Sequence, residues 1–160
     1  MEMDLPDAAA TEALGAALAE ALAAQAGAVI YLEGDLGAGK TTLARGLLRA
    51  LGVTGAIRSP TYTLMEHYRA GSHSVLHMDL YRLTDPLELA NLGLGDFPPA
   101  QTLWLVEWPQ RGGALLQTAQ LRVQLAAAGE GRTALLTADQ ALGKDFCSGL
   151  RQKLRHCTKN

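Results

Sequence analysis

The sequence has little of what marks secreted, membrane-bound or disulfide-linked proteins. Among its 160 residues are two cysteines, Cys147 and Cys157, both near the C-terminal end. At that spacing they can neither cross-link a core nor form a CxxC metal pair, so we interpret them as free thiols. No apolar run reaches the ~18 residues of a membrane span, and acidic residues stand where a secretory signal would carry basic ones. We therefore expect a cytoplasmic protein with no membrane partner.

A strong charge of either sign is also missing. The formal net charge is −2, with 14 basic and 16 acidic residues. Such a balance gives the whole molecule no electrostatic reason to seek nucleic acid. We expect no direct DNA binding, and any role on RNA would be indirect or local. The content of 48% apolar and 19% charged residues is typical of a globular protein, and the length fits a single domain spanning residues 1–160.

The hydrophobic pattern predicts helices and strands in alternation, followed by hairpins. We expect a helix from Ala8 to Gln25, a buried strand after Gly27, and a helix from Lys40 to about Leu51. A helix should start at Thr84–Pro86, and residues 139–160 are expected to form a C-terminal helix or tail. The strands expected further along the chain are Thr61–Tyr68 paired with Val75–Tyr81, Leu103–Val106, and Leu121–Leu125 paired with Thr133–Thr137. This order predicts the α/β class, a three-layer sandwich with a mixed central sheet flanked by helices and with antiparallel hairpins.

A glycine-rich segment lies between the first predicted strand and the second predicted helix. Residues 34–41 read GDLGAGKT and match G-x-x-x-x-G-K-[ST], the phosphate loop of P-loop NTPases. Glycines allow the turns that point backbone N–H groups at a polyphosphate, and the helix start adds its positive dipole end. Lys40 should reach the β- and γ-phosphates and Thr41 should bind Mg²⁺. We predict a nucleotide-binding segment comprising Gly34, Asp35, Leu36, Gly37, Ala38, Gly39, Lys40, Thr41 and Thr42.

Two carboxylates are candidates for the acidic partner that a hydrolytic P-loop site needs. Glu107 follows the apolar run 103–106, in the position of a Walker B acid, and Asp79 lies in the strand-like segment HMDLYRL. Either could instead be an ordinary strand-end or edge-strand charge. Period-two alternation places His77, Asp79 and Tyr81 on one strand face. We interpret His77 as a structural hydrogen-bonding partner rather than a chemical group.

The order and spacing of GDLGAGKTT, SPTYTL, HMDLYRL and VEWP resemble the bacterial TsaE family, also called YjeE. The resemblance covers about residues 11–111. It implies a small ATPase that works with the proteins TsaB and TsaD to form threonylcarbamoyladenosine beside the anticodon of certain tRNAs. The implied cofactors are ATP and Mg²⁺, and tRNA would be met only through the complex. Many relatives carry a second Glu after EWP, where this chain has Gln110.

Residue roles follow from the matching positions. The resemblance implies that Lys40, Asp79 and Glu107 are catalytic and that Thr41, Asp79 and Glu107 serve the metal. It also makes residues 59–61, including Thr61, a switch-like loop. Trp108 is implied to line the nucleotide pocket or a partner surface, with core packing as the alternative. Thr11 matches an N-terminal threonine that lines the base of the nucleotide.

We expect slow hydrolysis of ATP, in which Lys40 and Mg²⁺ neutralise charge on the transferred phosphoryl group and Asp79 or Glu107 orients the water. No arginine finger is identifiable, although Arg58 and Arg82 could approach the phosphates. Two other functions stay open. One is a small-molecule kinase, for which an arginine-rich lid and an acceptor pocket are not evident; the other is a nucleotide-gated binding module without significant hydrolysis.

Overall fold

The protein is described from a computed structural model, which covers residues 1–143 and 146–157. The side chains of residues 155–157 lie outside the described part, and with them the predicted free thiol of Cys157. The thiol of Cys147 is free, as predicted. No helix in the described ranges has the length and apolar character to cross a membrane.

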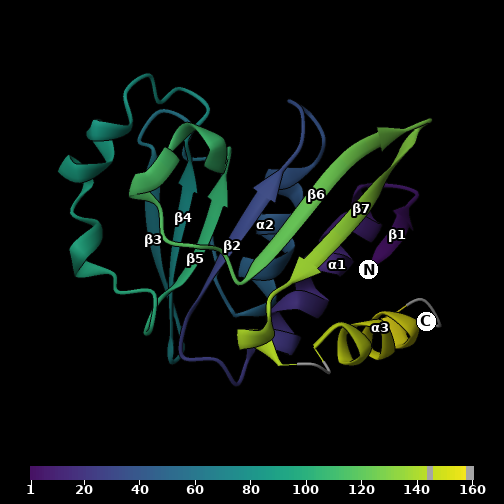
Figure 1. The fold of residues 1–160 in the computed structure, drawn as a ribbon. Helices are drawn as coiled ribbons and strands as arrows, with labels where there is room; N and C mark the ends of the chain where they lie inside the picture. The colour runs from purple at the N-terminus through teal and green to yellow at the C-terminus, as the bar shows by residue number, and fades with distance from the viewer. Residues whose placement is uncertain (144–145, 158–160) are drawn as a thin grey trace.

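A single mixed sheet forms the centre of the molecule (Figure 1). Its strands follow the order β1-β7-β6-β2-β5-β4-β3. The central strands β2, β4, β5 and β6 run parallel, while the hairpins β3–β4 and β6–β7 and the pair β1–β7 are antiparallel. The strands are β1 (Glu2–Leu5), β2 (Ala28–Glu33), β3 (Met65–Ala70), β4 (His73–Asp79), β5 (Leu103–Glu107), β6 (Leu121–Ala128) and β7 (Gly131–Ala138). The predicted α/β class and mixed sheet are confirmed.

Helices cover one face of the sheet. They are α1 (Ala8–Leu22), α2 (Lys40–Ala50) and α3 (Phe146–Cys157). Asp7 caps α1, because its side chain accepts a hydrogen bond from the backbone N–H of Ala10 at 2.7 Å. The helices bury leucine and alanine against the sheet in one large apolar cluster, to which α3 contributes Phe146 and Leu150.

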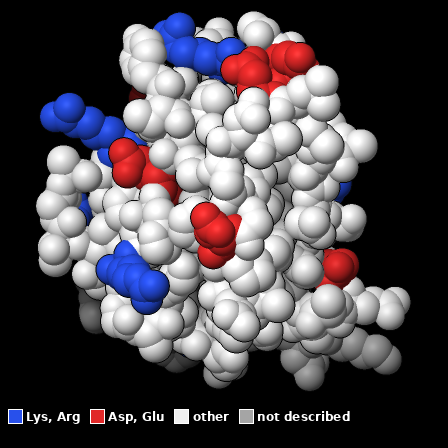
Figure 2. Space-filling view, turned by 90° about the vertical axis from the view of Figure 1, so that its left-hand side faces the viewer, with Lys and Arg blue, Asp and Glu red and all other residues white. Residues whose placement is uncertain are grey.

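The opposite face is covered by short 3₁₀ segments rather than by long helices. A second apolar cluster joins β2, β4 and β5 to residues of these segments and the connections around them. The 3₁₀ segments on this side are Pro86–Leu92, Leu94–Asp96, Pro109–Arg111 and Gly113–Leu115, whereas a further one, Gln140–Leu142, contributes Leu142 to the apolar cluster beneath the helices. Pro86–Leu92 begins with a capping box of Asp85 and Glu88, as the predicted start at Thr84–Pro86 suggested. On the side of the molecule shown in Figure 2, basic and acidic side chains are scattered and form no continuous patch of one sign.

Several element boundaries differ from the prediction. Strand β3 starts at Met65 rather than Thr61, because Leu64 has a φ of 65° and breaks the extended backbone. Strand β4 ends at Asp79 rather than Tyr81, since the Asp79 carboxylate accepts from the Tyr81 backbone N–H at 3.0 Å and turns the chain. Tyr81 therefore does not share a strand face with His77. Helix α1 ends at Leu22, earlier than Gln25.

The two ends of the chain also depart from the prediction. The predicted C-terminal helix or tail over residues 139–160 begins later as a helix: a 3₁₀ segment spans Gln140–Leu142, and helix α3 starts at Phe146. Strand β1 was not anticipated. It pairs with β7 at the edge of the sheet, so a partner more than a hundred residues away in sequence determines its structure.

Candidate functional site

The phosphate loop leaves the carboxyl end of β2 and enters α2 at Lys40. Gly34 has a φ of 136°, and a Cβ there would overlap the carbonyl oxygen of Leu125, so only glycine fits. Gly39, with a φ of 104°, is the N-cap of α2 and offers no side chain to the first N–H groups of the helix. Those N–H donors, together with the helix dipole, are therefore left for an anion.

The side chain of Lys40 is buried inside the phosphate loop. Its side-chain Nζ donates to the carbonyl oxygens of Gly34 and Asp35, both at 2.7 Å, and lies 4.2 Å from the ring centroid of Trp108. Burial lowers the pKa of Lys40, and attraction to Glu107, Asp79 and Asp35 partly restores it. The cation is thus present at the loop but held by neutral carbonyls, which a phosphate can replace.

The two predicted acids lie side by side at the ends of parallel strands. Asp79 of β4 and Glu107 of β5 are register partners, and their exposed fractions are 5% and 2%. The Thr41 hydroxyl lies 3.1 and 3.0 Å from the two carboxylate oxygens of Glu107. Nε2 of His77 lies 2.8 Å from Oε1 of Glu107, as expected for a structural hydrogen-bonding partner.

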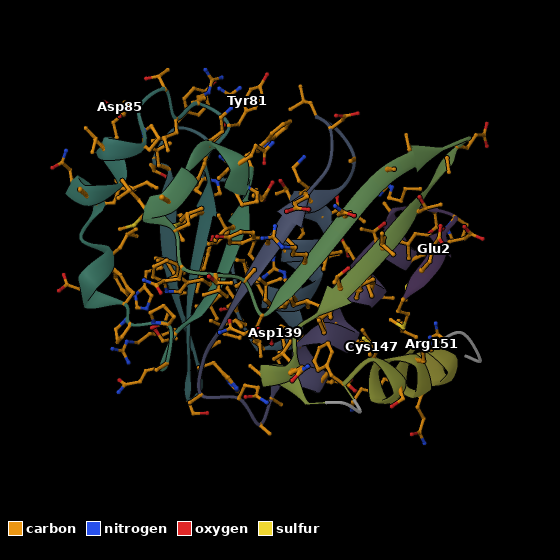
Figure 3. All side chains as sticks on the ribbon, viewed as in Figure 1. Glu2, Tyr81, Asp85, Asp139, Cys147 and Arg151 are labelled. Atoms are coloured by element: carbon orange, nitrogen blue, oxygen red, sulfur yellow. The ribbon has the colours of Figure 1, made fainter. Side chains whose placement is uncertain are left out.

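The predicted switch segment contacts the second acid. The Ser59 hydroxyl donates to Oδ2 of Asp79, whose Oδ1 accepts from the Tyr81 backbone. Tyr62, which directly follows this segment, is exposed, and the Arg82 guanidinium lies 4.4 Å from its ring centroid. Tyr81 packs against Trp108, with ring centroids 4.9 Å apart. Figure 3 shows Tyr81 at the end of the sheet where β4 and β5 finish, far from Cys147 and Arg151 on α3.

These groups surround one pocket of about 440 Å³, within the usual size range for small-molecule sites. Its lining comes from the phosphate loop, the switch segment and the ends of β4 and β5. The predicted residues that line it are Leu36, Gly37, Gly39, Lys40, Thr41, Thr42, Thr61, Asp79, Glu107 and Trp108. Gly34, Asp35 and Ala38 belong to the loop without lining the pocket. Of the two arginines considered from the sequence, Arg82 lines the pocket and Arg58 lines a neighbouring hollow.

Thr11 does not reach this pocket. It is fully buried on α1, and its hydroxyl accepts a hydrogen bond from Nη1 of Arg132 at 3.0 Å. Arg132, at the start of β7, was missed by sequence reasoning. A Cβ built on Gly39 would lie 2.9 Å from the same Nη1, so the guanidinium rests against the start of α2. Nothing local in the turn sequence GEGR indicates this position, because the contact depends on how β7 packs beside the loop.

The donor set suits Mg²⁺ better than a transition metal. Thr41, Asp79 and Glu107 supply only oxygen atoms, which Mg²⁺ prefers. In the described part of the chain no cluster of three or more His, Cys, Asp or Glu side chains is placed to hold a metal by itself. A cation here would need phosphate oxygens and water to complete its shell, which is the usual situation of Mg²⁺ in nucleotide sites.

A larger hollow of about 640 Å³ lies elsewhere, between β1, α1 and α3. None of its lining residues belongs to the phosphate loop, the switch segment or the strand-end acids, and its wall is mainly apolar. The chemistry of the molecule is therefore concentrated in the smaller pocket.

Comparison with known proteins finds relatives of this chain. A family model described as threonylcarbamoyl adenosine biosynthesis protein TsaE matches residues 5–135. A Haemophilus influenzae protein, named tRNA threonylcarbamoyladenosine biosynthesis protein TsaE, is 42% identical over 120 residues, which are 75% of this chain and 76% of that protein. A Synechocystis protein of the same name is 48% identical over 117 residues, covering 69% and 71% of the two chains. The crystal structure of Bacillus subtilis YdiB superposes with a TM-score of 0.71 at 31% identity, over 98% of this chain and 95% of that one.

Proposed function

Because the chain belongs to the TsaE family of threonylcarbamoyl adenosine biosynthesis, we propose that it binds Mg²⁺-ATP and hydrolyses it in the service of that tRNA modification. The observation that carries this proposal is the convergence on one pocket of Lys40, Thr41 and two buried strand-end carboxylates. A phosphate loop alone binds phosphate. The acids beside it supply what hydrolysis additionally requires.

Nucleotide binding would use the loop amides, the N-terminus of α2 and Lys40. On arrival of the phosphates, Nζ of Lys40 exchanges the carbonyls of Gly34 and Asp35 for phosphate oxygens. Arg132 adds a second positive charge near the start of α2, and buried Thr11 acts through it by holding its guanidinium. Trp108 stays against Lys40 and forms the wall of the pocket.

The residues that would hold Mg²⁺ are Thr41, through its hydroxyl, and the carboxylates of Glu107 and Asp79, directly or through water. When bound, the ion neutralises charge on the phosphate oxygens during phosphoryl transfer. Asp79 is also placed to orient the attacking water, since Ser59 and the Tyr81 backbone fix its carboxylate. The hydrogen bond from Ser59 also links Asp79 to the switch segment. Occupancy of the pocket would therefore be coupled to the conformation of residues 59–61.

We further propose that the whole chain acts as one domain, that it works in the cytoplasm with TsaB and TsaD, and that it meets tRNA only through that complex. Hydrolysis would then cycle the assembly rather than modify the tRNA. The exposed Tyr62 and Arg82 beside the pocket give a partner protein direct access to the switch segment. Stimulation by partners would follow from such access.

The first experiment is phosphate release from Mg²⁺-ATP by the purified protein, alone and with TsaB and TsaD. Lys40→Ala and Glu107→Ala should reduce release at least tenfold, because each removes charge stabilisation made in the transition state. Lys153→Ala is the matched control: it removes a partly exposed lysine of α3 that pairs with Glu20 of α1, and should leave release unchanged. Bound nucleotide without release under any condition would refute hydrolysis and leave a nucleotide-gated binding module. Phosphate appearing on an added acceptor would indicate a kinase.

A further inference from the structure

His77 lies in the interior of the sheet, next to the proposed metal site. It is fully buried on β4, and Val75, two residues earlier on the same strand, belongs to the apolar cluster beneath α1 and α2. Its Nε2 is 2.8 Å from Oε1 of Glu107, whereas its Nδ1 has no hydrogen-bond partner among the described residues. A buried polar atom without a partner is unfavourable. Among the described residues, the contact with Glu107 is thus the one hydrogen bond that offsets the burial of this imidazole.

That contact has a defined direction. A carboxylate only accepts hydrogen bonds, so Nε2 of His77 must carry the proton and donate it to Glu107. The second contact of Glu107 is with the Thr41 hydroxyl from α2. The carboxylate is thus held from two sides, by a strand and by a helix.

The two contacts differ in what happens when a metal nucleotide binds. Thr41 would offer its hydroxyl oxygen to the cation while its O–H proton can still reach Glu107, so this contact would be part of the metal site and would depend on occupancy of the pocket. His77 lies behind Glu107, away from the pocket lining, and its contact persists. The imidazole is therefore the contact of Glu107 that takes no part in binding the metal itself.

We propose that His77 is a positioning residue, which holds the Glu107 carboxylate in the orientation that serves the Mg²⁺ beside Thr41. This inference rests on the proposed function, and it adds a role that acts entirely through Glu107. His77 itself touches neither nucleotide nor metal. Groups that orient a metal-binding side chain commonly change metal affinity or activity about 10- to 100-fold when removed.

The test compares three substitutions of similar size. The side-chain amide of His77→Gln reaches the place of Nε2 and can still donate to Glu107, whereas that of His77→Asn reaches only the place of Nδ1. His77→Leu removes the donor altogether. We expect Leu and Asn to weaken Mn²⁺ binding to the ADP-loaded protein about 10- to 100-fold, measured by water-proton relaxation, and Gln to restore it to within a few-fold of wild type. ADP affinity without metal should stay unchanged in all three.

A double-mutant cycle with Glu107→Gln separates positioning from packing. If His77 acts through Glu107, His77→Asn should cost little further Mn²⁺ affinity once the carboxylate is gone. Equal affinities of Gln, Asn and wild type would overturn the proposal, as would full additivity in the cycle. Thermal unfolding of each variant checks the fold, and the Gln–Asn comparison decides even if His77→Leu does not fold. Wild-type protein that binds neither ADP nor Mn²⁺ would instead refute the proposed function itself.

Discussion

Lys40 gives the site its own dependence on pH. Burial lowers the pKa of its ammonium group below the ordinary value of 10.5, and bound phosphates favour the charged form and raise it again. Between these two pKa values nucleotide binding must take up a proton. Affinity for ADP is therefore complete below the lowered pKa of the free protein and should fall as the pH rises through that pKa, before 10.5 is reached.

Calorimetric titrations with ADP in buffers of different ionisation enthalpy measure both the affinity and the proton uptake. Lys40→Gln should bind weakly at all pH values and show no lysine-dependent slope. Lys153→Gln changes a partly exposed lysine of α3 instead and should keep the wild-type profile. An affinity of the wild-type protein that stays constant up to pH 10.5 would show that Lys40 does not titrate in this way.

The candidate site divides into residues that sequence could and could not predict. The residues of the phosphate loop are contiguous, so one sequence segment is enough to predict them. Asp79 and Glu107 could be found because both are associated with apolar strand patterns. Arg132 could not, since its hydrogen bond to Thr11 spans 121 positions and depends on the packing of β7. Tyr81 was wrongly predicted to lie in strand β4, because the side chain of Asp79 ends the strand. Period-two alternation does not predict where a side chain ends a strand.

Among the elements, those with local causes were predicted best. Helices α1 and α2 and strands β2 and β5 follow from propensity, capping and apolar runs. Strand β1 was missed because its four residues gain their structure from pairing with β7. Strand β3 starts late because Leu64 adopts a left-handed conformation, which its residue type disfavours. Elements that depend on distant partners thus lie beyond what the local pattern predicts.

Close contact between α1 and α2 supports the element that carries the phosphate loop. Gly46 of α2 packs directly on α1, where an added Cβ would overlap the Glu12 carbonyl oxygen. Gly46→Ala should therefore destabilise the protein by about 1–3 kcal/mol or more, through overpacking against backbone. Chemical denaturation measures this, with ADP affinity as a second readout, because a displaced α2 would move Lys40 and Thr41.

Gly149 on α3 provides the matched control for this substitution. Beyond its own helix backbone and chain neighbours, an added Cβ there would meet no atom of the described residues within 4 Å. Gly149→Ala should be neutral or should stabilise by up to about 1 kcal/mol, since alanine favours a helix over glycine. Equal effects of the two alanines would mean that helix propensity, and not the contact of α1 with α2, determines the cost.

At the scale of the whole molecule, the sheet lies between two apolar clusters, one on each face, and different kinds of element cover the two faces. Helices bury one face, and the 3₁₀ segments with their connections bury the other. The strands that end in Asp79 and Glu107 are shared by both layers, because their side chains alternate between the two faces. The end of the pocket that carries Asp79 and Glu107 thus depends on the packing of both faces at once.

We predict from that sharing that the chain unfolds as one domain, and this can be measured. Trp104 and Trp108 lie in or against the second cluster, so tryptophan fluorescence reports one face, while far-ultraviolet circular dichroism reports mainly the helices of the other. The two urea-unfolding curves should coincide. ADP at 100 times its Kd should shift both together by about 2.7 kcal/mol, and Lys40→Ala should abolish the shift. Separate transitions, or a shift seen by only one probe, would show that the layers unfold independently and that residues 1–160 are not one cooperative unit.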